Sequence, residues 1–316
     1  MYINFTVKAK KIGGNFMKIL NFGSCNLDYV YSLDHIVEEG ETETTENLET
    51  FPGGKGLNQS VALAKAGAEV YHAGCVGEDG DMLTAVLKEN GVDISLVKPV
   101  EGKNGHAIIQ LSREGKNSIF LYPGSNEKVT TEYIDEVLSK FTEGDFILLQ
   151  NEISNVKYII EKAYAKGISV FLNPSPFNEK MEEIDYSMVS YLVLNEVEAK
   201  AISGCEGVKG NVEYFRKTFP GLKVMLTLGS KGCVYFDEEK EISQNTFNVK
   251  VIDTTAAGDT FTGYFISGIA ASEPVEEVLR TASAASSIAV SRKGAAPSIP
   301  LRDEVITALE VLVEDK

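Results

Sequence analysis

An acid stands at the start of an expected helix in the segment Asp253–Gly263, where small residues lead directly into a helical pattern. Small side chains leave the main chain exposed. The amides of Ala256, Ala257 and Gly258 at a helix N-terminus could therefore bind the negative charge that gathers on a phosphoryl group. Asp259, in the first turn, could accept a proton from an attacking hydroxyl. A favourable first-turn acid beside the helix dipole is the simpler alternative, but the whole segment favours catalysis.

A second candidate segment, Phe51–Gln59, is rich in glycine. Its main chain could approach a ligand closely while Lys55 and Asn58 contribute donors. A flexible turn with a solvated lysine explains this segment equally well when it is considered alone. It is not a Walker A loop, because no G-x-x-x-x-G-K-[ST] occurs in the sequence, and no G-x-G-x-x-G follows an expected strand. These absences disfavour P-loop NTPases and dinucleotide dehydrogenases.

Asn26 and Asp28 lie two residues apart, beyond an apolar run that ends at Gly23. In an extended chain both side chains would face the same side, where they could jointly hold neighbouring sugar hydroxyls. An Asx turn that closes the strand accounts for this pair equally well.

These residues need a scaffold, and the apolar runs of the chain indicate one. Runs of strand length alternate with helical periodicity, which is typical of a parallel sheet covered by helices on both faces. The expected strands are Lys18–Gly23, Phe146–Gln150, Ser169–Asn173, Tyr191–Leu194 and Val224–Leu228, with an extended segment at Phe247–Ile252. The expected helices are Asn58–Ala66, Asn155–Lys166, Glu196–Ser203, Gly258–Ala271 and Val275–Ser291, with a last helix from Asp303. The predicted fold class is α/β, a doubly wound, mostly parallel sheet whose strand ends carry the site.

Two further segments predict a small β-sheet lid outside this fold. Thr42–Phe51 has an extended character, and two apolar runs between Gly105 and Tyr122 flank a hairpin turn. The predicted organisation is an extension at 1–16 and a single domain over 17–316, with lid strands from about 29–52 and 104–122.

Composition limits the classes of partner. The chain has 316 residues, 43% of them hydrophobic, which is enough for a substantial core. Its 46 acidic and 30 basic residues give a net charge of −16, which would repel nucleic acid and anionic membrane surfaces. The four cysteines form no metal-ligand pattern, and no apolar stretch is long enough to span a bilayer. We therefore expect a cytoplasmic protein without nucleic-acid or membrane partners.

Three segments together resemble a known family. They are Gly23-Ser24-x-Asn26-x-Asp28, Gly53-Gly54-Lys55-Gly56-x-Asn58-Gln59 and Asp253-Thr254-x-Ala256-Ala257-Gly258-Asp259-Thr260-Phe261. In order and spacing they resemble the PfkB carbohydrate kinases, and within that family the ribokinases. The resemblance runs from about Lys18 to the last helix, and the third segment is highly specific for the family.

The resemblance implies a role for each matching residue. Asp259 matches the catalytic base, behind an anion hole at Ala256, Ala257 and Gly258. The positions that match sugar-binding residues are Asn26, Asp28, Gly54, Lys55, Asn58 and Glu152. Those that resemble nucleotide-binding residues are Asn195, Thr227, Gly229, Ser230 and Gly232, and Glu198 resembles an acid that helps to organise Mg²⁺ and phosphates. Those that match a K⁺ site are Asp253, Thr255, Ala289, Arg292, Gly294 and Ser298.

Several of these positions have simpler interpretations when each is considered alone. Glu152 could be a solvated acid at a strand end, and Asn195 could simply cap the helix that follows it. Residues 229–232 could be a plain hairpin turn. Pro52 and Leu57 depart from the family pattern beside the expected sugar site, so the identity of the sugar is the least specified feature.

The resemblance implies an ATP-dependent kinase that phosphorylates the primary hydroxyl of a small sugar. D-ribose is the expected acceptor, which would give ribose 5-phosphate. The resemblance also implies that the enzyme uses Mg²⁺, that K⁺ activates it, and that it forms a homodimer through the lid. Deoxyribose, a hexose such as fructose, and a nucleoside are alternative acceptors. A non-catalytic sugar- or nucleotide-binding regulator is a second alternative, against which the intact run Ala256–Asp259 argues. A nicotinamide oxidoreductase is disfavoured by the missing glycine fingerprint.

Overall fold

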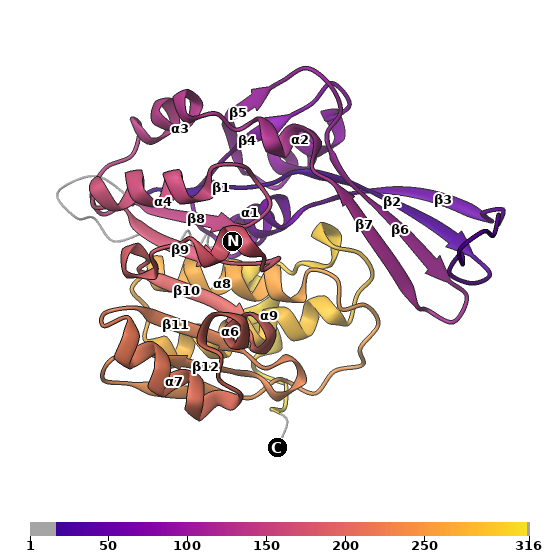
Figure 1. Ribbon diagram of the computed structural model, residues 1–316. Helices are drawn as coiled ribbons and strands as arrows, with labels where there is room; N and C mark the ends of the chain where they lie inside the picture. Colours follow the sequence, from indigo (N-terminus) through magenta and orange to yellow (C-terminus); the bar gives the residue numbers. More distant parts are fainter. Residues whose placement is uncertain (1–16, 315–316) are drawn as a thin grey trace, which may run out of the picture.

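The body of the molecule is one large sheet (Figure 1). The computed structural model describes residues 17–314, and over this range the sheet has nine strands in the order β13-β12-β11-β10-β9-β8-β1-β4-β5. Its strands are β1 (Ile19–Phe22), β4 (Val70–Val76), β5 (Asp93–Pro99), β8 (Phe146–Gln150), β9 (Ser169–Asn173), β10 (Tyr191–Asn195), β11 (Lys223–Thr227), β12 (Cys233–Phe236) and β13 (Glu241–Gln244). Neighbours from β5 to β11 pair in parallel, and β12 and β13 pair antiparallel. The predicted, mostly parallel α/β sheet is confirmed.

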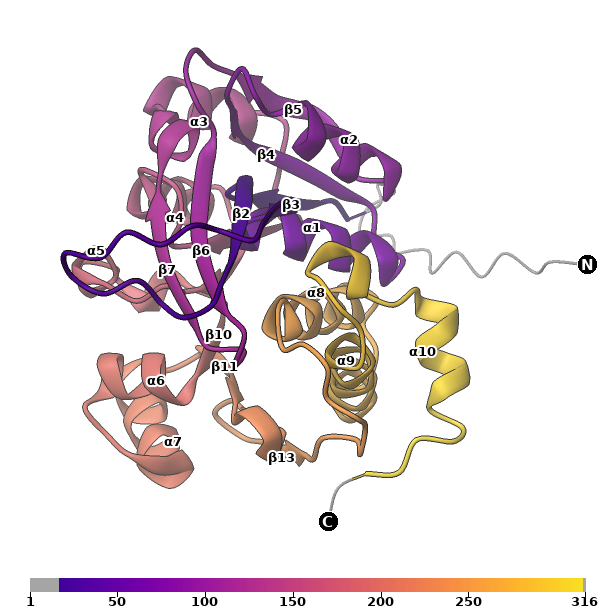
Figure 2. The ribbon, with the colours of Figure 1, turned by 90° about the vertical axis from the view of Figure 1, so that its right-hand side faces the viewer.

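Helices cover both faces of this sheet, and each face has its own core. In β8, Leu148 enters one core, while Ile147 and Leu149 enter the other. The helices of the first face are α1 (Lys55–Lys65), α2 (Asp81–Glu89), α8 (Ala257–Ala270), α9 (Val275–Val290) and α10 (Arg302–Ala308). Those of the second face are α3 (Thr131–Leu138), α4 (Val156–Ala165), α5 (Glu179–Glu182), α6 (Glu196–Ser203) and α7 (Gly207–Thr218) (Figure 2). Because the central strands are buried on both sides, they read as continuous apolar runs in the sequence.

The predicted strands and helices differ from the observed ones only locally, but four strands of the large sheet (β4, β5, β12 and β13) and four helices (α2, α3, α5 and α7) were not predicted. Helix α1 begins at Lys55 and not at Asn58, so the glycine-rich segment forms its first turn. Gly54 permits this start because its φ of 91° is a conformation that residues with a side chain rarely adopt. The segment Phe247–Ile252 was expected to be extended, but within residues 17–314 it pairs only through an isolated bridge from Phe247. The predicted extension at 1–16 lies outside the described residues.

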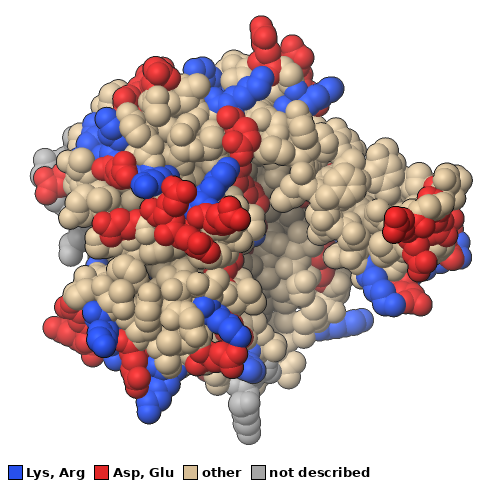
Figure 3. Space-filling model, in the orientation of Figure 1, with Lys and Arg blue, Asp and Glu red and all other residues tan. Residues whose placement is uncertain are grey.

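A second, smaller sheet projects from the body (Figure 1). Its strands are β2 (Asn26–Leu33), β3 (Asn47–Gly53), β6 (Gly105–Ser112) and β7 (Asn117–Tyr122), in the order β3-β2-β6-β7. Strand β2 pairs in parallel with β6 and antiparallel with β3. Since β2 starts just beyond the carboxyl end of β1, the root of this sheet lies at the edge where sites form in such folds. A hollow separates the projecting sheet from the body (Figure 3).

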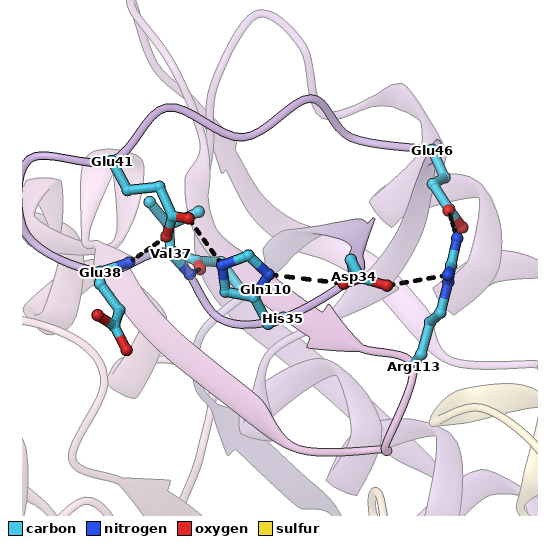
Figure 4. Close-up of polar contacts among 8 residues, drawn as sticks. All are labelled: Asp34, His35, Val37, Glu38, Glu41, Glu46, Gln110 and Arg113. Atoms are coloured by element: carbon cyan, nitrogen blue, oxygen red, sulfur yellow. Dashed lines mark hydrogen bonds and ion pairs between the residues drawn. The ribbon is translucent and has the colours of Figure 1, made fainter.

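An acidic loop at residues 34–46 closes the far end of the small sheet, and polar contacts hold it there (Figure 4). The guanidinium of Arg113, from the turn between β6 and β7, pairs with Asp34 at 2.9 Å and also with Glu46. Within the loop, His35 Nε2 pairs with Glu41 at 2.9 Å. These groups are exposed, so water and salt screen their charges and each pair stabilises the loop only slightly.

Candidate active site

Asp259 lies in the first turn of α8 and is buried. Its Oδ1 accepts a hydrogen bond from Gln59 Nε2 at 2.8 Å, and its Oδ2 accepts one from Asn58 Nδ2 at 3.1 Å. Both donors belong to α1, which lies beside α8 in the first core. An acid that served only the dipole of α8 would not need two buried amides from another helix. The geometry therefore favours a functional carboxylate.

The turn before α8 is constrained by hydroxyl groups. Ala256 adopts a left-handed conformation with φ of 57°, which is uncommon for a residue with a side chain. Three hydroxyls donate to consecutive carbonyls: Thr260 Oγ1 to Ala256 at 2.8 Å, Ser286 Oγ to Ala257 at 3.0 Å, and Thr262 Oγ1 to Gly258 at 2.8 Å. These bonds fix the direction in which the first amides of α8 point.

The amides of this turn are not equivalent. The amide of Ala257 donates to the carbonyl of Thr254 at 3.2 Å, so it is already used within the protein. The amides of Gly258 and Asp259 follow it in the first helical turn, where N–H groups have no intrahelical partner. A Cβ atom on Gly258 would meet nothing within 4 Å, so an anion can approach closely there. Of the predicted anion-hole amides of Ala256, Ala257 and Gly258, that of Ala257 is thus already engaged, and the amides of Gly258 and Asp259 are in a position to meet an anion.

The predicted sugar-binding residues gather at the root of the small sheet. Glu152, just beyond β8, accepts from Ser24 Oγ at 2.5 Å and from the amide of Lys55 at 2.9 Å. Glu152 is therefore not a solvated strand-end acid, because it joins the end of β1 to the start of α1. The carboxylate of Asp28 lies against Gly53, where an added Cβ would come within 2.1 Å of Asp28 Oδ2.

The charges of this cluster influence one another. Burial, together with the charge of Glu152, raises the pKa of Asp28 to about 7. Burial likewise raises the pKa of Glu152. For Lys55, burial is the largest influence and lowers the pKa, but the carboxylates of Asp259, Glu152 and Glu198 together outweigh burial and raise it. Lys55 therefore stays charged among three acids, where it can neutralise an incoming phosphate.

Two cavities meet at the start of α8. One, of about 220 Å³, is polar, and its lining includes Lys55, Asn195, Glu198 and Asp259. The other, of about 360 Å³, is more apolar, and its lining includes Gly229, Ser230, Gly232, Phe247 and Phe261. Thr227, Thr254, Ala257 and Gly258 line both. A ligand with an apolar end and an anionic end could therefore lie across the helix N-terminus.

The simpler interpretations of the nucleotide segments are correct, but they do not exclude a site. Asn195 caps α6 by accepting from the amide of Glu198, and Glu198 accepts from the amide of Asn195 at 3.0 Å, which is a capping box. Residues 229–232 form the tight turn between β11 and β12. Both segments nevertheless line the cavities, so the same residues shape the turns and the site.

The residues of this site could bind Mg²⁺ only together with the phosphates of a substrate. Within residues 17–314, no three His, Cys, Asp or Glu side chains cluster in a way that could hold a metal ion. Glu198 is an acid of the polar cavity. Mg²⁺ in phosphoryl-transfer sites is commonly held by one or two carboxylates together with substrate phosphates, and Glu198 fits that pattern.

The expected K⁺ residues come together in two adjoining segments. Asp253 Oδ2 accepts from the amide of Gly294 at 2.9 Å, and Asp253 Oδ1 accepts from Thr255 Oγ1 at 2.6 Å. Ser298 Oγ donates to the carbonyl of Ala295. The guanidinium of Arg292 pairs with Glu304 at 3.0 Å, so contact between Arg292 and a cation would come from its main chain. Oxygen donors of this kind suit a hard monovalent cation.

The sequence model of the pfkB family of carbohydrate kinases matches residues 17–302 of this chain. The chain belongs to the PfkB family of carbohydrate kinases. This PfkB kinase is 34% identical to the ribokinase of Haemophilus influenzae over 300 residues, which are 91% of this chain and 97% of that protein. It is 36% identical to the Bacillus subtilis ribokinase over 289 residues, covering 90% and 96% of the two chains.

A solved structure agrees with the sequence relatives. The structure of Arabidopsis thaliana ribokinase complexed with ribose and ATP matches this PfkB kinase with a TM-score of 0.81 and 31% identity, over 93% of this chain and 99% of that one. The protein is therefore an ATP-dependent sugar kinase of the ribokinase family, which confirms the predicted class of enzyme.

In the part of the chain that the structure describes, no helix is long and apolar enough to cross a bilayer.

Several residues of this PfkB kinase site were given no role from sequence. Ser24 and Gln59 lie inside the recognised segments, but nothing in their spacing showed that they bind Glu152 and Asp259. Asn126 was missed altogether. Its Nδ2 donates to Asn26 Oδ1 at 2.7 Å, across 100 residues of sequence. Contacts over that separation leave no local pattern, so no signal in a single sequence could have found Asn126.

Proposed function

We propose that this kinase transfers the γ-phosphate of ATP to the primary hydroxyl of D-ribose, giving ribose 5-phosphate. The proposal is carried by the position of Asp259. This buried acid lines the polar cavity, and it is held by the side-chain amides of Asn58, which is itself a predicted sugar-binding residue, and of Gln59. Relatives that cover nearly the whole chain are named ribokinases, and one such structure contains ribose and ATP.

The proposed chemistry uses groups of this chain throughout. Asp259 accepts the proton of the primary hydroxyl as that oxygen bonds to the γ-phosphorus, and the bond from phosphorus to the β–γ bridging oxygen breaks. The amides of Gly258 and Asp259 and the ammonium of Lys55 stabilise the developing charge. Bound Mg²⁺, held through Glu198, would supply further neutralisation of the phosphates. The adenine would occupy the more apolar cavity, with Phe247 and Phe261 in its lining.

The acceptor is tested by coupled ADP release with MgATP and KCl, across ribose, deoxyribose, fructose, adenosine and no acceptor. Ribose should give the highest kcat/KM, because Asp28 can accept from two adjacent hydroxyls. Turnover with another acceptor alone would keep the chemistry and replace the substrate. Repeating the ribose assay with tetramethylammonium in place of K⁺ tests the K⁺ proposal, for which activity should fall.

Sugar affinity should rise with pH through the neutral range. Sugar hydroxyls donate to the ionised form of Asp28, whose pKa is raised to about 7 in the sugar-free protein. Binding therefore favours loss of the proton, and affinity should increase between about pH 6 and pH 8 and then level off. Calorimetric titration in buffers of different ionisation enthalpy would detect the released proton. Asp28→Asn should flatten the profile. An affinity that is constant over this range, with no proton release, would rule out this role for Asp28.

The small sheet supports a proposed homodimer. Strand β7 lies at the edge of the sheet and exposes four large apolar side chains: Ile119 (52%), Phe120 (57%), Leu121 (53%) and Tyr122 (52%). Leu48 and Phe51 of β3 are also exposed. A second copy of the same sheet would cover both an unpaired edge and this apolar surface, as in an isologous interface.

Light scattering should give twice the mass of 34.4 kDa for the chain. Ile119→Asp combined with Phe120→Asp places one charge on each face of β7 and should yield a monomer, because desolvating these carboxylates is costly. A wild-type protein that is monomeric at every concentration up to about 100 μM would refute the dimer.

A further inference from the structure

We propose that Gln59 is a positioning residue for Asp259, and that two main-chain carbonyls fix the direction of its amide. They act through the buried side chains of Asn21 and Gln150 and the half-buried side chain of Asn173. The amide of Gln59 then presents only N–H groups to the acid. This inference rests on the proposed role of Asp259 as the base.

Two chains of hydrogen bonds lead from main-chain carbonyls to Gln59, and together they are called the relay here. The first arm of the relay starts at the carbonyl of Gly56, which can only accept. Asn21 Nδ2 donates to it at 2.7 Å, so Asn21 Oδ1 must point the other way. Gln150 Nε2 donates to Asn21 Oδ1 at 3.0 Å and to Gln59 Oε1 at 2.7 Å. Since an amide has one oxygen and one NH₂ group, Gln59 must turn its Nε2 away from Gln150 and toward Asp259.

The second arm starts at the carbonyl of Val193 and gives the same answer. Asn173 Nδ2 donates to this carbonyl at 2.9 Å, which leaves Asn173 Oδ1 as an acceptor. Gln59 Nε2 donates to Asn173 Oδ1 at 3.1 Å and to Asp259 Oδ1 at 2.8 Å. Both hydrogens of the NH₂ group are therefore used. Each end of the Gln59 amide is set by a main-chain group whose polarity cannot change.

Burial makes this arrangement rigid. Asn21, Gln59 and Gln150 have no exposed surface. A flipped Gln59 amide would place Oε1 against the carboxylate and NH₂ against NH₂, and buried polar groups without partners are costly. Asp259 consequently meets only donors on this side. The proton taken from the sugar must then go to a carboxylate lone pair that faces the substrate.

Gln59→Glu tests the inference, because it keeps the shape of the side chain and replaces the NH₂ group with an oxygen. We expect kcat to fall about 100-fold, since a displaced base loses alignment with the hydroxyl. KM for the sugar should change by less than about 3-fold. The acidic limb of the kcat–pH profile should move to higher pH, because two facing carboxylates share a proton. Gln150→Glu, one link further away, should reverse the relay and lower kcat in the same direction.

Thermal melting of each variant separates positioning from simple loss of structure. If Gln59→Glu does not fold, Gln59→Met gives the same comparison without a charge, and the fall in kcat at constant KM is still expected. Folded Gln59 variants with an unchanged kcat and pH profile, beside an inactive Asp259→Asn, would overturn the inference alone. An active Asp259→Asn would overturn the proposed base as well.

Discussion

Replacement of Asp259 with asparagine should lower kcat by about 10³-fold, within the range that general bases contribute, while ATP and sugar still bind. Asparagine keeps the size of the side chain but cannot take the proton of the sugar hydroxyl. It also turns one NH₂ group toward the donors of Asn58 and Gln59, which accounts for a modest loss of stability. Turnover by coupled ADP release and binding by calorimetry would measure the two effects separately.

Asp81→Asn is the matched control for this variant. Asp81 is also an acid in the first turn of a helix, α2, but it is exposed and lies outside both cavities described above. If Asp259 acted only on the helix dipole, the two substitutions would each cost about 0.3–1 kcal/mol of stability and leave turnover alone. A fall in kcat confined to Asp259→Asn would identify the base. Equal kcat values in the two variants would contradict it.

Gly56→Ala should produce the largest loss of stability among conservative changes to the site. A Cβ at this position would lie 2.3 Å from the amide nitrogen of Ser24 and 2.5 Å from the carbonyl carbon of Gly23. Those are main-chain atoms, so helix α1 and the end of β1 would have to move apart. We expect a loss of about 3 kcal/mol and weaker sugar binding, because the Ser24–Glu152–Lys55 contacts span the same junction. Denaturant unfolding measures the first effect and calorimetry the second.

Gly258→Ala is the matched control, since it makes the same substitution in the first turn of α8. An added Cβ there meets nothing within 4 Å, so stability should be unchanged or slightly raised. Turnover should nevertheless fall, because the methyl group would enter the space of the anion. Equal stability of the two variants would show that the junction at Gly56 tolerates a side chain.

The sequence predicted five strands of the large sheet, β1 and β8 to β11, because these strands are largely continuous apolar runs, but it did not predict β4, β5, β12 or β13. It placed the start of α1 three residues late, since the conformation of Gly54, which allows the earlier start, leaves no apolar signal. The small sheet was outlined by its hairpin, but the partner of β6 was not predictable, because β2 pairs with it across about 80 residues. Local periodicity cannot report such pairing.

The candidate site was predicted as three separate segments, and the contacts between the segments were not. Glycine-rich and acidic residues at element ends have a recognisable pattern. By contrast, the bond from Gln59 to Asp259 spans 200 residues. The same holds for Gln150 and Asn21, which would pass for ordinary polar residues inside apolar strands. Their function depends on the three-dimensional neighbours of each amide, which only the fold supplies.

The packing of α1 against α8 also sets the order of events during synthesis of the chain. Helix α8 emerges from the ribosome about 200 residues after α1, which is a delay of roughly 10–40 s at common elongation rates. During that interval Leu57, Val61 and Leu63, which are fully buried in the finished protein, lack one of their covering helices. Until α8 has emerged, the nascent chain therefore leaves part of the apolar surface of α1 uncovered, and it gains Asp259 only when almost complete.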